Sequence, residues 1–458
     1  MSSRQLDFTK GSIPRHLLTF SWPMFLGNLL QATYNTVDSI WVGRFLGPHA
    51  LGAVSVSMPI SFGLVSMVMG LAVATTTLIA QARGAGDEVG VRRISNNSVV
   101  LMGILGLVLS VVGVYVRHPM LRLINTPPEI ASQAAVYLGI FLAGTFFAFL
   151  YNVASAILRG LGDSRTPMVY LMWAVIANMI LDPICILGLG PIPAMGVGGA
   201  ALATVFAQAL SAVFSIRHLI VSAKVLRLSR ADGPLLDRDL TAQTLRIGLP
   251  AGLQQTMVSF AALAVNSVIN SFGPAVVAGA GAGARLDQFA FMPAFSISMA
   301  VSALVGQNVG AGRFERVKEI VYWSGVLGAA ITGAVSIVVL SIPQTLLGMF
   351  TTDPAVLEVG TSYLRIMGLV YIPFALMFVM TGVLRGAGDT VATMFNTLGS
   401  LWLVRVPLVR FLSGPAGLGT RGLWIGMAAS SFVGLGLNYA YYRSGRWKRK
   451  VVITAKEA

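Results

Sequence analysis

The chain has 458 residues, of which 55% are hydrophobic and only 11% are charged, and its mean hydropathy is +0.77. This composition excludes an ordinary water-soluble domain and is typical of a protein with many membrane spans. The net charge of +15 would suit a nucleic-acid-binding protein, but the basic residues are distributed as in a membrane protein, which excludes that class.

Roughly twelve apolar stretches are long enough to cross a bilayer as a helix, which takes about 20 residues. Their near-continuous apolarity fits helices better than the alternating pattern of barrel strands. In chain order the predicted spans lie near residues 16–42, 50–82, 94–117, 131–157, 166–189, 196–220, 247–272, 276–308, 319–341, 357–384, 391–413 and 420–442. We therefore predict an all-α integral membrane protein with twelve transmembrane helices.

The basic residues follow the positive-inside rule if the amino terminus is cytoplasmic. Most of the 32 Lys and Arg then lie in cytoplasmic segments, including Arg83 to Arg93, Arg217 to Arg246 and Arg443 to Lys456. The opposite loops carry only Arg44, Arg117, Arg122, Arg410 and Arg421. This bias predicts a multi-pass protein of the cell (inner) membrane with both termini in the cytoplasm and no nucleic acid as partner.

Three acidic residues fall well inside predicted spans: Asp38 in the first, Asp182 in the fifth and Asp287 in the eighth. A charge at the centre of a membrane helix costs about 2.5–3.5 kcal/mol on insertion scales, so each acid is a functional candidate. The first and fifth spans both run outward, and Asp38 and Asp182 stand at similar distances from their outer ends. We predict that these two carboxyl groups share one site in the outer half of the membrane.

Each of these two acids has a polar residue one helical turn before it on the same face, Tyr34 before Asp38 and Asn178 before Asp182. Pro183 follows Asp182 directly, and a proline inside a span leaves a backbone carbonyl without its donor. Two carboxylates in a low-dielectric site cannot both stay ionised easily, so the pair is expected to bind a proton or hold a cation. The alternative is a purely structural role, in which the acids tie the Tyr and Asn side chains together for packing.

The chain contains an internal repeat with a constant offset of 226 residues. The paired segments are "LIAQARGAGDEVGVRRI" (78–94) with "LVGQNVGAGRFERVKEI" (304–320), "AILRGLGDSRTPM" (156–168) with "GVLRGAGDTVATM" (382–394), and "VYL" (136–138) with "SYL" (362–364). Pro23 and Pro250 align with a slip of one residue. Six spans in each half place both halves in the same orientation, so we predict two six-helix bundles related by a pseudo-twofold axis along the membrane normal.

A polar and charged stretch, "VSAKVLRLSRADGPLLDRDLTAQTLR", separates the two halves. The predicted domains are an N-terminal bundle over 1–220 that carries ion coupling, a cytoplasmic connector over 221–246, a C-terminal bundle over 247–442 and a basic cytoplasmic tail over 443–458.

The second half has no counterpart of the first-half acids, because the offset aligns Asp38 with Ala264 and Asp182 with Leu408. Ion coupling is therefore assigned to the first half.

Asp287 and two arginines are the charged candidates within the spans of the second half. Asp287 lies two residues after Arg285, and such a pair can neutralise itself, so a structural or gating role and direct coupling both stay open. Arg405 in the eleventh span has no obvious partner and either faces a cavity or extends to the membrane surface.

The "RGxGD" turns at 159–163 and 385–389 have two readings. A glycine after a helix end is a common C-cap, and an arginine beside it favours the helix carboxyl end and the cytoplasmic interface. A gating role is the alternative.

Other kinds of site have no pattern here. Cys185 is the single cysteine, which excludes an internal disulfide, and the four histidines lack ligand spacing, so no structural metal is expected. No phosphate-binding glycine loop or nucleophile with a base is present, so we expect neither an enzyme nor a cofactor other than the coupling ion.

Several motifs, taken in this order, resemble the multidrug and toxic compound extrusion (MATE) family. They are "SWPMFLGNLLQATYNTVDSIWVGRFLG" at the start, "LRGLGD" and "LRGAGD" after spans four and ten, and "ANMILDPICILGLG" in span five. The resemblance covers essentially the whole chain. It implies a V-shaped pair of helix bundles around a central cavity, and export of organic cations and other amphipathic compounds in exchange for protons or sodium.

Judged by its first-half acids, the chain more closely resembles the DNA-damage-inducible protein F branch of that family. This resemblance implies a cation-coupling site at Asp38, Asn178, Asp182 and Thr204, with Tyr34, Trp41 and Tyr137 nearby and Pro23 at a bend in the first helix. The chain departs from the NorM-type pattern, which has an acid in span seven, because "GLPAGLQQTMVSFAALAVNS" has none.

Together these features predict a secondary antiporter for drugs or organic cations that works by alternating access, with H⁺ or Na⁺ as coupling ion, as a monomer in the lipid bilayer. A flippase for lipid-linked precursors is the alternative; it would need a cationic cavity, for which Arg285 and Arg405 are the candidates, and often extra spans. A major-facilitator transporter should carry GxxxDRxGRR after span two, which "ARGAGDEVGVRR" fits poorly.

Overall fold

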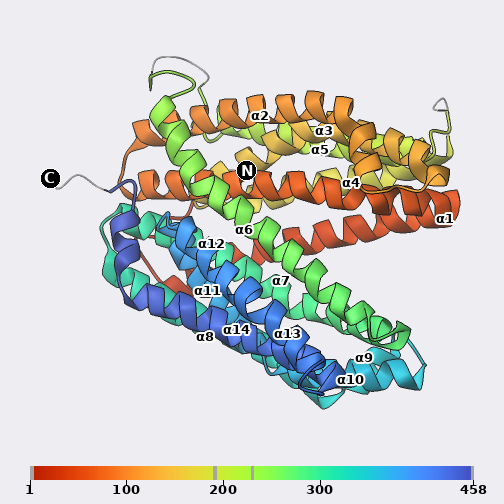
Figure 1. Cartoon of the computed structure of the whole chain (residues 1–458). Helices are drawn as coiled ribbons and strands as arrows, with labels where there is room; N and C mark the ends of the chain where they lie inside the picture. The colour runs from red at the N-terminus through yellow and green to blue at the C-terminus, as the bar shows by residue number, and fades with distance from the viewer. Residues whose placement is uncertain (1–4, 189–192, 228–231, 455–458) are drawn as a thin grey trace. The chain divides into compact units, whose positions relative to one another are not determined.

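The computed structural model describes residues 5–188, 193–227 and 232–454 (Figure 1). Within these ranges the secondary structure is helical and contains no strand, which confirms the predicted all-α class. The chain divides into two compact units. Unit 1 comprises Met1–Leu6 and Pro23–Leu249, and unit 2 comprises Asp7–Trp22 and Pro250–Ala458.

Unit 1 holds five helices of the first half. They are α1 (Ile13–Gly84), α2 (Glu88–Leu123), α3 (Pro128–Gly160), α4 (Arg165–Leu187) and α5 (Val197–Val221). α1 covers the first two predicted spans. A kink separates these spans, because the backbone is non-helical at Gly47 (φ 81°, ψ −174°), just before Pro48. α3 packs between α2 and α5, and α5 also packs on α4 (Figure 1).

Unit 2 holds the helices of the second half. They are α6 (Arg238–Asn270), α7 (Pro274–Gly310), α8 (Phe314–Ser341), α9 (Pro343–Gly348), α10 (Pro354–Gly368), α11 (Tyr371–Gly386), α12 (Thr390–Leu398), η2 (Gly399–Arg405), α13 (Val406–Ser413), α14 (Gly419–Arg443) and η3 (Arg446–Lys450). The first turns of α1 group with unit 2 and the first turns of α6 group with unit 1. The change of unit falls at Pro23 in α1 and at Pro250 in α6.

The twelve predicted spans fall on helices, apart from a few turn residues at their ends and at the break between α10 and α11. Leu189, at the end of the fifth predicted span, lies outside the described residues. In the part of the chain that the structure describes, nine helices are long and apolar enough to cross a membrane, or ten if a bent pair counts as one span. The bent pair is α10 and α11, which meet at 50° within the predicted span 357–384. The predicted span 391–413 is also irregular, because η2 is a π-helix between α12 and α13.

The internal repeat recurs as the same packing contact in both units. A Cβ added to Gly160, at the end of α3, would lie 2.9 Å from the carbonyl oxygen of Thr76 on α1. A Cβ added to Gly386, at the end of α11, would lie 2.5 Å from the carbonyl oxygen of Ser302 on α7. Both glycines and both carbonyls are related by the 226-residue offset, so the two units bring their helices together by the same close backbone approach.

The "RGxGD" turns have a clear structural role. Their second glycines, Gly162 and Gly388, take left-handed backbone conformations with φ of 87° and 90°. The aspartates that follow hold the start of the next helix: Asp163 Oδ1 accepts from the backbone N–H of Thr166 (3.0 Å), and Asp389 Oδ1 accepts from that of Ala392 (3.2 Å). These contacts account for the motif by helix capping.

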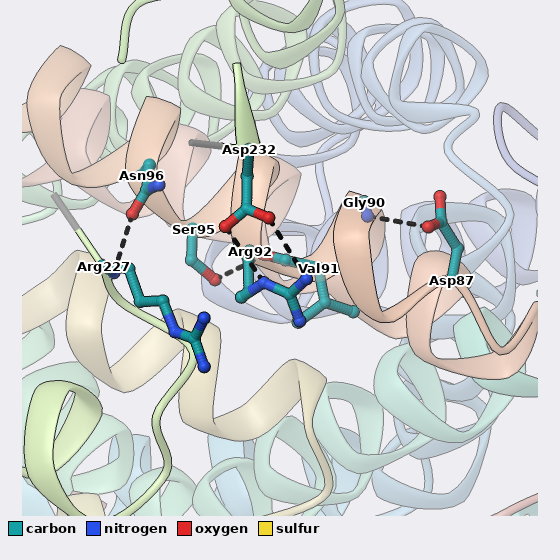
Figure 2. A network of polar contacts seen from close by, with 8 residues as sticks. All are labelled: Asp87, Gly90, Val91, Arg92, Ser95, Asn96, Arg227 and Asp232. Carbon is teal, nitrogen blue, oxygen red and sulfur yellow. Dashed lines mark hydrogen bonds and ion pairs between the residues drawn. The ribbon is translucent and has the colours of Figure 1, made fainter. Parts of the chain in front are cut away.

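The connector is fixed to the first turns of α2 by ion pairs and a hydrogen bond, and Figure 2 shows those made by Arg92 and Asn96. The Arg92 guanidinium donates two hydrogen bonds to the Asp232 carboxylate (3.1 and 3.2 Å), and the side chains of the pair are 22% and 16% exposed. Asn96 Oδ1 accepts from the backbone N–H of Arg227 (3.1 Å), and Arg93 pairs with Asp237 (2.7 Å). Residues 228–231 of the predicted connector lie outside the described residues.

The segment before α1 packs on unit 2 although it begins the first half of the sequence. Phe8 is 1% exposed, and its backbone N–H donates to Gln307 Oε1 (3.0 Å). The Phe8 carbonyl accepts from Asn308 Nδ2 (3.1 Å) and from Arg316 Nη2 (3.3 Å). This exchange differs from the predicted domains, which place the start of the chain in the N-terminal bundle.

Candidate functional site

Unit 1 gathers polar side chains from four helices into one place, here called the unit 1 cluster. Its members are Tyr34 and Asp38 on α1, Tyr137 on α3, Asn178 and Asp182 on α4, and Thr204 on α5. Asn178 and Asp182 are fully buried, Asp38 is 8% exposed, and Tyr34 is half-buried. The structure therefore brings together six of the residues that the sequence singled out.

Two hydrogen bonds join members of the unit 1 cluster. Asn178 Nδ2 donates to Asp182 Oδ1 (3.1 Å), which is the contact expected for two residues one turn apart on a helix. Tyr34 Oη donates to Thr204 Oγ1 (2.9 Å) and so connects α1 to α5. The tyrosine one turn before Asp38 thus bonds to a hydroxyl on another helix and not to the carboxylate that follows it.

The remaining acceptors of the cluster are not satisfied. Asp38 Oδ1, Asn178 Oδ1 and Asp182 Oδ2 are buried and find no hydrogen-bond donor among the residues that the structure describes. A buried polar atom without a partner costs about 1–3 kcal/mol, and more if it is charged. Three such oxygens in one cluster point to a ligand that supplies positive charge or a proton.

The two carboxyl groups of the cluster are close enough to interact. Asp182 on α4 interacts electrostatically with Asp38 on α1. Tyr34 and Tyr137 each interact electrostatically with both acids. Because two like charges oppose each other in a buried site, a proton or cation that enters the cluster relieves their repulsion.

The other residues predicted for the first half lie around the cluster or away from it. Trp41 stacks on Phe45, with ring centroids 5.0 Å apart, and packs against the same apolar group as Tyr137. Pro183 lies inside α4 directly after Asp182. Pro23 also lies inside its helix, but it precedes Tyr34 by about three turns and marks the point where α1 passes from unit 2 to unit 1.

The expected pairing of Arg285 with Asp287 does not occur among the ion pairs of the described residues. The two side chains point to different faces of α7: Arg285 is exposed and lies over the ring of Phe350 at 5.9 Å, whereas Asp287 is 4% exposed. Asp287 instead accepts hydrogen bonds from Tyr363 (2.5 Å) and Tyr371 (2.6 Å).

Arg405 has a partner that the sequence did not reveal. Its Nε donates to Ser430 Oγ on α14 (2.7 Å), and it interacts electrostatically with Tyr363. This arginine therefore belongs to the interior of unit 2.

The two tyrosines that bond to Asp287 were not predicted from the sequence. They lie 76 and 84 residues away, so no local spacing links them to the acid. One signal was present: Tyr363 is the tyrosine of "SYL", the repeat counterpart of Tyr137 in "VYL".

The unit 1 cluster has the donor atoms that suit a proton or a small hard cation. It combines carboxylate, amide and hydroxyl oxygens, which are the ligands that such cations take in proteins. Within the described ranges, no three His, Cys, Asp or Glu side chains gather in a way that would hold a metal ion. The oxygens of the cluster can accept a proton or coordinate a small cation reversibly.

Comparison with known proteins gives one family. A protein-family model described as MatE matches the chain twice, at residues 23–184 and 250–410, and the two matches repeat the spacing of the internal repeat. The chain is 33% identical over 454 residues to "Probable multidrug resistance protein YpnP" of Bacillus subtilis, covering 98% of this chain and 99% of that protein. It is 30% identical over 444 residues to "Probable multidrug resistance protein NorM" of Thermotoga maritima, covering 96% and 95%.

The solved structures agree with this result. The fold matches a structure described as "Outward-facing conformation of a multidrug resistance MATE family transporter of the MOP superfamily" with a TM-score of 0.90. The identity is 25%, and the match covers 98% of this chain and 99% of that chain.

Proposed function

The chain belongs to the MatE family, a family of multidrug transporters, and from this membership we propose that it is a secondary antiporter that exports organic cations and other amphipathic drugs in exchange for H⁺ or Na⁺. It is a multi-pass membrane protein and a transporter, not an enzyme. The first-half acids further favour the branch that resembles DNA-damage-inducible protein F.

The observation that carries the proposal is the set of three unsatisfied oxygens on Asp38, Asn178 and Asp182. A structural role for the acids predicts saturated hydrogen bonds, because unpaired buried acceptors destabilise the fold. A coupling site, in contrast, needs acceptors that are satisfied only when the ion is bound. The three unpaired oxygens of the unit 1 cluster support a coupling site.

Coupling follows from linkage between the ion and the drug. The ion neutralises the repulsion between Asp38 and Asp182 and so changes how α1 packs on α4 and α5, through the Tyr34 to Thr204 hydrogen bond. If the drug binds better to the conformation without the ion, each ligand displaces the other. Alternating access then exchanges one for the other across the membrane.

The gradient that drives transport identifies the ion. We expect everted membrane vesicles that contain the protein to accumulate a fluorescent cation such as ethidium under either an imposed proton gradient or an imposed sodium gradient. Asp38→Asn and Asp182→Asn variants, expressed at the parental level, should lose this accumulation. Parental accumulation by both variants would refute coupling at the cluster.

A lipid-linked precursor flippase is not favoured. Such a protein needs a cationic cavity for a pyrophosphate headgroup, but Arg405 is engaged with Ser430 and Arg285 lies exposed beside Phe350. The relatives from Bacillus subtilis and Thermotoga maritima are named for multidrug resistance. A lipid-translocation assay in proteoliposomes separates the two functions, and we expect no translocation above protein-free liposomes.

We also propose that the protein resides in the cytoplasmic membrane as a monomer with both termini inside. The basic residues near α2 and in the tail after α14 support this orientation. Single cysteines placed at exposed positions 10 and 449, in a Cys185→Ala background, should react with a membrane-impermeant maleimide only in everted vesicles.

A further inference from the structure

Asp287 on α7 is a buried acid of unit 2, and each of its two carboxyl oxygens is held by a tyrosine from a different helix. Asp287 Oδ2 accepts from Tyr363 Oη (2.5 Å) on α10, and Oδ1 accepts from Tyr371 Oη (2.6 Å) on α11. The three side chains are 4%, 3% and 1% exposed. The acid, the two tyrosines and their bonds are called the unit 2 clamp below.

The unit 2 clamp spans the break in a membrane-crossing segment. α10 ends at Gly368, α11 begins at Tyr371, and the two helices meet at 50°. Tyr363 lies before the break, and Tyr371 is the first residue after it. A single carboxylate therefore holds both halves of the bent segment, so a change at Asp287 acts directly on the bend.

The surroundings of the clamp are aromatic and apolar. Trp424 on α14 meets the Tyr363 ring edge-on, with centroids 4.8 Å apart, and Phe291 meets the Tyr371 ring edge-on at 5.9 Å. The other elements packed here contribute apolar side chains, among them Val265 and Ile269 from α6, Val339 from α8, Leu347 from α9 and Val409 from α13.

The charged groups near the clamp do not pair with its carboxylate. Arg405 on η2 interacts electrostatically with Tyr363 and donates to Ser430, and Arg285 of α7 is exposed on another face of its helix. Asp287 is therefore a buried acid whose hydrogen-bond partners are neutral hydroxyl groups. A buried carboxylate without a cation is costly, and binding a proton is the simplest way to neutralise it.

We infer that Asp287, Tyr363 and Tyr371 form a proton-binding site in unit 2, separate from the unit 1 cluster, which controls the bend between α10 and α11. When Asp287 is ionised, both hydroxyl groups donate to it and hold the two helices. When it takes up a proton, that proton occupies one carboxyl oxygen and turns it from acceptor to donor. One tyrosine then has to rotate its hydroxyl hydrogen away, which weakens the hold on one half of the segment.

A metal cation fits this site less well than a proton. Both tyrosine hydrogens point at the carboxylate oxygens, so a cation on those oxygens would face two positive dipoles. In the unit 1 cluster, by comparison, three oxygens carry no donor. The two sites therefore differ in the ligand they suit.

The repeat relation supports a functional reading of the clamp. Tyr363 and Tyr137 are counterparts in the two halves, and each interacts with buried acid: Tyr363 with Asp287, and Tyr137 with Asp38 and Asp182. The acids themselves stand on non-equivalent helices. Each unit thus has its repeat tyrosine near buried carboxyl groups, although the acids lie on helices that the repeat does not relate.

Infrared difference spectroscopy of the purified full-length protein tests proton binding directly. The Asp38→Asn/Asp182→Asn double variant removes the acids of unit 1. In this variant we expect the carbonyl band of a protonated carboxyl group to appear as pH falls and to vanish after the further change Asp287→Asn. The site is refuted if no such band titrates, or if the band persists after Asp287→Asn.

If the variant with all three Asp→Asn changes does not fold, a tyrosine variant in the Asp38→Asn/Asp182→Asn background still tests proton binding at Asp287. Tyr371→Phe removes one donor from the ionised carboxylate, so the band should persist to higher pH, with its midpoint moved by about one pH unit. Tyr322→Phe, which removes an exposed hydroxyl from α8, should leave the midpoint in place. An unchanged midpoint in Tyr371→Phe would overturn the inference.

The bend is measured separately. With Cys185 replaced by Ala, spin labels at the exposed positions 358 and 372 report the distance between α10 and α11. We expect this distance to change with pH in the parent and to be fixed in Asp287→Asn; a pH-independent distance in the parent would refute control of the bend. Only an effect of the unit 2 clamp on transport would rest on the proposed antiport. Proton binding and the pH-dependent bend are tested independently of it, because these spectra need no drug gradient.

Discussion

At the scale of single residues, the unit 1 cluster and the unit 2 clamp differ in the hydrogen bonding of their buried carboxylates. Asp182 accepts one hydrogen bond, from Asn178, and keeps its other oxygen unpaired, whereas both oxygens of Asp287 are occupied. Because an unpaired acceptor is costly and a paired one is not, the first arrangement favours ligand entry more strongly. The unit 1 cluster is therefore the better candidate for the primary ion site.

The hydrogen bond from Asn178 to Asp182 should tune ion binding. A hydrogen bond to a charged group contributes about 1.5–3 kcal/mol, so its loss in Asn178→Ala should change the ion concentration for half-maximal drug uptake about tenfold. Asn152→Ala is the matched control, because within the described part of the chain the Asn152 side chain donates to the Ala148 carbonyl of its own helix and to no other residue. Equal ion dependence of Asn178→Ala and the parent would contradict a role for this bond.

The acids of the first half could be predicted from sequence because a charge stands out within an apolar run, and because Tyr34 and Asn178 lie one turn away. The partners of Asp287 and Arg405 could not. Tyr363, Tyr371 and Ser430 are unremarkable in a membrane span, and only the fold brings them to these charges.

At the scale of helices, the predicted spans coincide with helical residues, but two irregularities within spans were not predicted. α10 and α11 separate just before Pro373, and η2 lies just before Pro407. A proline clashes with the carbonyl four residues earlier and removes a helix hydrogen bond, which explains a break or a π-turn at these places. A hydropathy profile averages over a window of residues, so it does not reveal a local break in a helix.

The shared glycine contact should be essential to helix packing in both units. Alanine at Gly386 would place its Cβ 2.5 Å from the Ser302 carbonyl oxygen, which is backbone and cannot move aside easily. We expect Gly386→Ala to destabilise the protein by about 1–3 kcal/mol and to lower its Tm in detergent. Gly436→Ala, whose added Cβ meets nothing within 4 Å, should not lower the Tm; equal losses in both variants would contradict the packing argument.

The connector should detach from α2 in acid. The Arg92 guanidinium lowers the pKa of Asp232, and the backbone N–H of Leu240, with Arg93, lowers the pKa of Asp237. A lowered folded-state pKa gives stabilisation that is complete above the ordinary carboxyl pKa, about 4, and is lost as pH falls through the lowered values. Both pairs should therefore be intact at neutral pH.

Hydrogen exchange measures this attachment. Protection of a peptide covering residues 232–241, corrected for the intrinsic exchange rate, should hold from pH 7 to about pH 4 and fall below that. Arg92→Gln should lower the protection already at pH 7, whereas a peptide from α14 should not respond. Loss of protection in the parent between pH 7 and pH 5 would contradict the role of the two aspartates.

At the scale of the whole molecule, the repeat predicted two related halves, and the two matches to the MatE model have the same spacing. The exchange of the first turns of α1 and α6 between the units was not predicted. Hydropathy identifies which segments enter the membrane, but it carries no information about which bundle a helix end packs on. The contacts of Phe8 with Gln307 and Asn308 are specific hydrogen bonds over about 300 residues of sequence, which only tertiary structure reveals.

The central claim is that drug and ion compete through the carboxyl pair of unit 1. It is tested most directly by adding ethidium to the purified protein in weakly buffered solution and measuring the protons or sodium ions released. The parent should release ions as the drug binds, and Asp38→Asn/Asp182→Asn should bind the drug without releasing them. Release of as many ions by the double variant as by the parent would contradict the claim.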